Sequence, residues 1–110
     1  MVNTKDDMRV VQEEIFGPVV VATPFDDPEE LTPRANDTVY GLAAGIWTKD
    51  ISKAHRLAAA LQAGTVWINC YNIFDAALPF GGYKQSGWGR EMGKDVLNNY
   101  TQTKAVCVRI

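Results

Sequence analysis

Residues 43–70 read AAGIWTKDISKAHRLAAALQAGTVWINC, and this stretch decides the fold. Its two ends, 43–48 and 65–70, are short apolar runs typical of buried strands. Between them, Asp50 is a candidate N-cap for a helix that Gly64 ends. One face of this helix carries apolar residues at helical spacing, namely Ile51, Ala54, Ala58 and Leu61. The order strand, helix, strand predicts two parallel strands joined by a right-handed crossover.

A similar unit precedes this one in the sequence. Residues 18–25, PVVVATPF, form a β-branched run typical of a buried strand. Asp27 is a candidate N-cap and is followed by Pro28 at the first position of a helix. Pro33 lies inside this helix, so we expect a kink, or a restart with Thr32 as a second cap. Together the two units predict an α/β fold with a parallel β-α-β-α-β core.

The pattern changes after the third predicted strand. Residues 71–89 show no helical or strand periodicity, and loops of this length are uncommon in compact domains and often functional. We expect a final helix over about 90–99 and a last strand at about 104–110, KAVCVRI.

A glycine-rich stretch, PFGGYKQSGWGRE, occupies residues 79–91 at the end of this segment. It is not a P-loop, because Trp88 and Gly89 stand where that motif requires Lys and Ser or Thr. No strand leads directly into the glycines, and their spacing departs from the Rossmann fingerprint. We expect the glycines to form tight turns, with Lys84 and Arg90 pinning the loop by bonding carbonyls or acidic partners. The residues alone leave open whether this loop is structural or contacts a ligand.

Composition narrows the class of protein. The 110 residues are 46% hydrophobic and 22% charged, with a net charge of −2, which predicts one globular domain over 1–110. Scattered cations argue against nucleic-acid binding, and no apolar run is long enough to span a membrane. The polar start and the two cysteines, without clustered metal ligands, predict a cytoplasmic protein with no metal site.

Several motifs resemble, in order and approximate spacing, the NAD(P)-dependent aldehyde dehydrogenase superfamily. The similarity covers about residues 7–110. It rests on EEIFGPVVV at 13–21, NDTVYGLAAGIWT at 36–48, AGTVWIN at 63–69 and PFGGYKQSGWGRE at 79–91. The resemblance implies that the chain is a C-terminal segment of such an enzyme.

The resemblance also implies roles for single residues. Glu14 would accept hydrogen bonds from the nicotinamide ribose of NAD or NADP, while Phe16 and Leu42 would contact the nicotinamide. Phe74 and Phe80 would line the aldehyde tunnel, where two aromatic rings favour an apolar or cationic substrate body. Without the resemblance, Glu14 reads as an exposed charge at a strand end, Phe16 as a core residue and both tunnel rings as packing under a loop.

No catalytic residue is assigned within the chain. In the family, a cysteine in a G-Q-x-C context attacks the aldehyde and a glutamate in an E-L-G-G context is the general base, and the resemblance places both upstream of Glu14. Cys70, in WINCYN, matches a strand end beside the tunnel. We therefore expect the 110 residues alone to be inactive and to associate as a homo-oligomer through 104–110. The alternative is a catalytically inactive folding or oligomerisation module.

Overall fold

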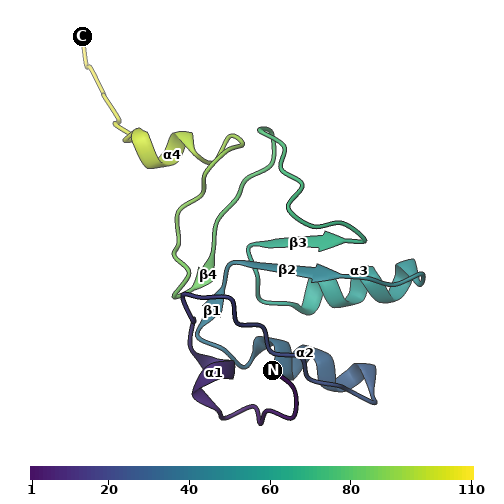
Figure 1. Cartoon of the computed structure of the whole chain (residues 1–110). Helices are drawn as coiled ribbons and strands as arrows, with labels where there is room; N and C mark the ends of the chain where they lie inside the picture. Colours follow the sequence, from purple (N-terminus) through teal and green to yellow (C-terminus); the bar gives the residue numbers. More distant parts are fainter.

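The computed structural model describes all 110 residues, which form four helices and four strands (Figure 1). In chain order these are α1 (Arg9–Gln12), α2 (Pro28–Asn36), β1 (Tyr40–Gly41), β2 (Ala43–Ile46), α3 (Ile51–Ala60), β3 (Thr65–Ile68), β4 (Tyr83–Lys84) and α4 (Leu97–Tyr100). The strands make two separate two-stranded sheets, a parallel β2–β3 pair and an antiparallel β1–β4 pair. None of the helices has the length and apolar character that a transmembrane span requires.

The predicted β2–α3–β3 unit is confirmed. The two strands pair in parallel from Ala43 opposite Thr65 to Ile46 opposite Ile68, and α3 runs alongside them (Figure 1). The Asp50 carboxylate caps α3 by accepting a 2.9 Å hydrogen bond from the Lys53 amide, which lowers the pKa of this carboxyl. The unit therefore forms as its local sequence signals indicate, except that α3 ends at Ala60 and not at Gly64.

The core of this unit is small. Ile46, Ala54 and Trp67 are the buried apolar residues of the whole chain. On the predicted apolar face of α3, Ala54 is fully buried and Ala58 is half-buried, but Ile51 is exposed. The chain has a radius of gyration of 18.4 Å, compared with about 13 Å for a compact domain of this length. Most of its large apolar side chains therefore remain exposed.

Helix α2 begins as predicted but does not break at Pro33. The Asp27 carboxylate accepts a 2.9 Å hydrogen bond from the Glu29 amide, and Pro28 is the first helical residue. The expected restart at Thr32 is wrong, because one continuous helix runs through Pro33, while the kink at Pro33 stays a prediction. The next residue, Arg34, holds this turn in place by bonding the Asp6 carboxylate and the Pro24 carbonyl, each at 3.1 Å.

The first strand of the predicted β-α-β-α-β core is absent. Residues 18–25 are not assigned to a strand, since neither edge of the β2–β3 pair bonds to them. Their backbone instead makes local or N-terminal contacts, such as the 2.9 Å bond from the Ala22 amide to the Met1 carbonyl. A β-branched run needs a partner to become a strand, and here it has none.

The C-terminal end of the single chain differs from two expectations. The predicted helix over 90–99 is reduced to α4, because Met92 and Gly93 both have φ of +59° and interrupt the helical backbone. Residues 104–110 form no strand and extend away from α4 as an unpaired, exposed tail (Figure 1).

Candidate substrate and cofactor site

The glycine-rich loop is built by backbones that approach one another closely. A Cβ added to Gly64, which precedes β3, would overlap the carbonyl oxygen of Gly81. A Cβ on Gly81 would in turn collide with the carbonyl oxygen of Gly89. The Gly64 amide also donates a 3.0 Å hydrogen bond to the Gly41 carbonyl, which anchors this crossing to the end of β1. These glycines are required because no side chain fits between the segments.

Both predicted pins of the loop are confirmed, and both bond carbonyls. Arg90 donates from Nη1 to the Gly82 and Gly89 carbonyls at 2.9 and 2.8 Å, and its guanidinium lies 5.6 Å from the centre of the Tyr83 ring. Lys84 donates from Nζ to the carbonyls of Asn36 and Thr38 at 2.7 and 3.0 Å. These bonds fix the loop against the end of α2 and the start of β1.

The two predicted tunnel residues lie against each other. The rings of Phe74 and Phe80 meet edge to face, with centroids 5.2 Å apart and planes inclined by 78°. The Trp67 ring supports Phe74 from β3 in the same manner, at 5.6 Å and 87°. Trp67 also donates from Nε1 to the Ile73 carbonyl at 2.8 Å, so the irregular segment is attached to the core at two points.

This supporting role of Trp67 was missed by sequence reasoning, which treated the residue only as part of a strand. Its 7% exposed surface makes it one of the chain's few buried side chains. The row of rings continues to Tyr71, 5.0 Å from Trp67, and from there to Trp47 at 6.3 Å. The signal available in the sequence was the high aromatic content on both sides of Cys70.

Leu42 and Phe80 line one hollow of about 240 Å³ beneath the glycine-rich loop. The rest of its wall comes mainly from the loop itself and includes Trp88 and Arg90. The hollow therefore brings a predicted nicotinamide contact and a predicted tunnel residue to the same place, although they are far apart in sequence.

Glu14 and Phe16 follow α1 and do not line this hollow. Phe16 is 94% exposed, so it is not a core residue of this chain. Arg9 donates two hydrogen bonds to Glu13, at 2.7 and 2.9 Å, and these lower the pKa of the Glu13 carboxyl. The neighbouring Glu14 carboxylate is exposed and unpaired, so its oxygens are free to accept bonds from a vicinal diol.

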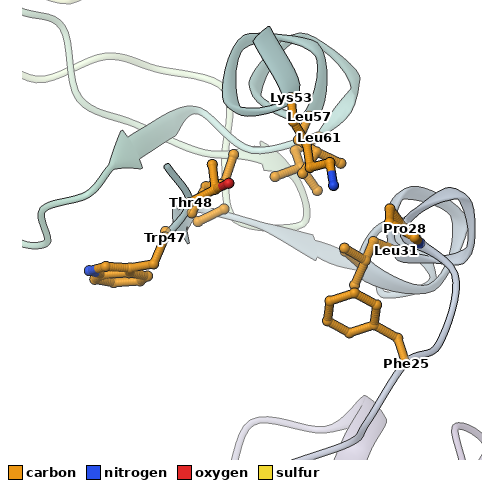
Figure 2. Close-up of a pocket in the computed structure, with 12 residues that line it drawn as sticks. Phe25, Pro28, Leu31, Trp47, Thr48, Lys53, Leu57 and Leu61 are labelled. Carbon is orange, nitrogen blue, oxygen red and sulfur yellow. The ribbon is translucent and has the colours of Figure 1, made fainter. Parts of the chain in front are cut away.

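A larger groove of about 440 Å³ lies between α2, α3 and β2, and none of the predicted site residues lines it. In Figure 2, Leu31 comes from α2, Leu57 and Leu61 come from α3 and its end, and Phe25 closes the side beside α2. This wall is apolar and brings no paired titratable groups together. The groove is separate from the candidate site.

The remaining reactive side chains do not form a further centre. Cys70 is half-buried, Cys107 is exposed, and both thiols are free. No three residues of the types His, Cys, Asp and Glu lie close enough to hold a metal ion.

Comparisons with known proteins agree on one family. The sequence model described as "Aldehyde dehydrogenase family" matches residues 1–106. The chain is 58% identical over 108 residues to the putative aldehyde dehydrogenase DhaS of Bacillus subtilis, covering 98% of the chain and 22% of that protein. It is 54% identical over 110 residues to human 4-trimethylaminobutyraldehyde dehydrogenase, covering 100% and 22% respectively. The structure of an NAD+ complex of aldehyde dehydrogenase from Bacillus cereus superposes with a TM-score of 0.93 at 60% identity, covering 99% of this chain and 22% of that one. The chain thus spans about one fifth of the length of these relatives.

Proposed function

Because this chain belongs to the aldehyde dehydrogenase family, we propose that its 110 residues are the C-terminal part of an oxidoreductase that converts an aldehyde to a carboxylic acid with NAD or NADP. The observation that carries the proposal is the hollow in which Leu42 and Phe80 face the same space. A dehydrogenase must hold a flat nicotinamide and an aldehyde next to each other, and this hollow offers an apolar contact for each.

Some of the site residues are assigned to the cofactor and the others to the aldehyde. Glu14 accepts hydrogen bonds from the nicotinamide ribose hydroxyls, and Phe16 and Leu42 contact the nicotinamide. NAD or NADP supplies the acceptor for the hydride that leaves the aldehyde carbon. Phe74 and Phe80 form a wall of the aldehyde tunnel, and their perpendicular rings suit an apolar or cationic substrate body.

The thiol and the general base belong to parts of the enzyme outside these 110 residues. The sequence around Cys70, WINCYN, is not the G-Q-x-C context of the family's nucleophile. The 110 residues alone therefore contribute pocket walls and no reacting group. Their alternative function is that of an inactive folding or oligomerisation module.

A hybrid enzyme separates these two functions. In the hybrid, the 110 residues replace the equivalent segment of the Bacillus cereus enzyme, which they match at 60% identity. We expect the hybrid to form NADH or NADPH with aldehydes, while the 110-residue chain alone forms none. A folded hybrid without turnover would contradict the proposed oxidoreductase role. Turnover by the isolated chain would contradict the assignment of the reacting groups to other parts.

Glu14→Gln in the hybrid tests the cofactor contact. The amide keeps the size of the side chain but removes the charge of the ribose acceptor, so we expect kcat to fall about tenfold or more with an unchanged thermal midpoint. Glu13→Gln is the matched control, since Glu13 is already bonded to Arg9. It should leave kcat within about twofold. Equal kinetics for the two variants would remove the role assigned to Glu14.

We expect the protein to bind a second copy of itself through the tail at 104–110. Val106, Val108 and Ile110 are exposed and alternate with Ala105, Cys107 and Arg109, and the backbone of the tail has no partner. Such an extended segment pairs readily with a free strand edge of another chain. We expect the hybrid to sediment as an oligomer at micromolar concentration and to dissociate when residues 104–110 are deleted. If the oligomeric state measured by sedimentation is unchanged after the deletion, association depends on other surfaces.

A further inference from the structure

Three segments that are distant in sequence meet at Asn36, the last residue of α2. Its side-chain Nδ2 donates to the Ala60 carbonyl at 3.0 Å, and its Oδ1 accepts from the Gln62 amide at 2.8 Å. Its backbone carbonyl accepts a 2.7 Å bond from the ammonium of Lys84. One residue thereby joins the end of α2, the end of α3 and the glycine-rich loop.

Lys84 is held in an unusual backbone conformation at this junction. Its φ is +53°, a region that L-residues other than glycine rarely adopt and that persists only where surrounding contacts fix it. The ammonium forms no ion pair and is satisfied by the carbonyls of Asn36 and Thr38. These charge-assisted bonds hold the loop at this point, together with the 2.9 Å bond from the Gln85 amide to the Val39 carbonyl.

The junction continues directly into the walls of the candidate site. Lys84 pairs with Tyr40 in the β1–β4 ladder, and the next pair joins Tyr83 to Gly41. The Ser86 hydroxyl accepts a 3.0 Å bond from the Gly41 amide, which precedes Leu42. Phe80 lies ahead of β4, four residues before Lys84. The bonds of Lys84 and Ser86 thus connect the segment that carries Leu42 to the segment that carries Phe80.

From this geometry we propose that Lys84, acting through the Asn36 and Thr38 carbonyls, is a positioning residue that sets the nicotinamide side of the pocket relative to the aldehyde side. The inference rests on the proposed function. Lys84 does not line the hollow that Leu42 and Phe80 share, so it acts through these two residues. Hydride transfer requires the two reacting carbons within a few tenths of an ångström of their working separation, and a displacement of about 1 Å can cost about a hundredfold in rate.

The test uses the hybrid enzyme with Lys84→Met, which keeps most of the apolar stem and removes the ammonium. We expect kcat to fall by about tenfold or more while KM for aldehyde and cofactor stays within about threefold. We also expect the deuterium isotope effect on kcat, measured with aldehyde deuterated at the carbonyl carbon, to rise as hydride transfer becomes slower. Lys84→Arg retains the charge and two donors and should recover most of kcat. Lys49→Met is the control, since Lys49 is an exposed lysine that makes no hydrogen bond.

The outcomes separate this inference from the proposed function. No turnover by the unsubstituted hybrid would overturn both. Turnover by the hybrid with unchanged kcat and isotope effect in a folded Lys84→Met variant would overturn the positioning role alone. If Lys84→Met does not fold, Lys84→Gln takes its place, because its amide can still donate to one carbonyl. A Gln variant with the isotope effect of the unsubstituted hybrid would likewise overturn the role, and a raised isotope effect that Arg reverses would support it.

Discussion

Gly64→Ala in the hybrid enzyme is expected to abolish folded, soluble protein. The added methyl group would overlap the Gly81 carbonyl oxygen, and the atoms on both sides belong to backbone, which cannot rotate away as a flexible side chain can. Overpacking typically costs about 1–3 kcal/mol and more where the backbone must move. The Gly64 position is also tied down by the bond from its amide to the Gly41 carbonyl.

Gly81, on the other side of this contact, cannot easily move away from Gly64 either. Gly81 is itself in close contact with the Gly89 carbonyl and the Arg90 side chain, so a shift of Gly81 would displace the whole loop. We therefore expect a loss of at least about 3 kcal/mol, at the upper end of overpacking effects. The measurements are soluble yield and thermal midpoint.

Gly17→Ala is the matched control for this substitution. A Cβ on Gly17 meets no atom within 4 Å, and its φ is outside the positive region. We expect its thermal midpoint to stay close to that of the unsubstituted hybrid. A Gly64→Ala protein that is as soluble and as heat-resistant as the Gly17→Ala protein would show that the loop does not lie against Gly64 in the assembled enzyme.

The parts of the fold that could be predicted from sequence are those set by neighbouring residues. Asp27 and Asp50 each cap the helix that follows them, and both were recognised from residue type and position alone. The β2–α3–β3 unit has short connections, so its pairing requires little beyond the local pattern. Local signals were also sufficient to predict that Lys84 and Arg90 hold the loop by bonding carbonyls or acidic partners, and the structure shows that the partners are carbonyls.

The features that the sequence did not predict depend on distant partners or on backbone conformation. Residues 18–25 have the composition of a strand, but a strand forms only if another edge accepts it. The predicted final helix is longer than the observed one, because Gly93, at positive φ, interrupts a stretch whose apolar spacing is helical. For the candidate site, the proximity of Phe74 and Phe80 was expected only from family resemblance. The contact between Lys84 and Asn36 joins residues 48 positions apart and has no sequence signal.

Trp67→Ala in the hybrid is expected to destabilise the fold and to damage the aldehyde side of the pocket. Trp67 is the largest buried side chain of the chain, and truncating a buried aromatic residue to alanine typically costs about 3–5 kcal/mol. The substitution also removes the ring against Phe74 and the Nε1 donor to the Ile73 carbonyl. The irregular segment would then lose both of its attachments to β3.

Two further variants distinguish loss of packing from loss of the hydrogen bond. Trp67→Phe retains an aromatic ring but leaves the Ile73 carbonyl unpaired, which should cost only about 1–3 kcal/mol. Trp88→Ala removes a ring that is 97% exposed and should leave the thermal midpoint nearly unchanged. For protein that remains folded, we expect kcat/KM for aldehyde to fall in Trp67→Ala while the Kd of the cofactor stays constant, because the proposed function assigns Phe74 and Phe80 to the aldehyde tunnel. An equal loss of cofactor affinity would mean that Trp67 supports the whole pocket and that the aldehyde wall is not a separate unit.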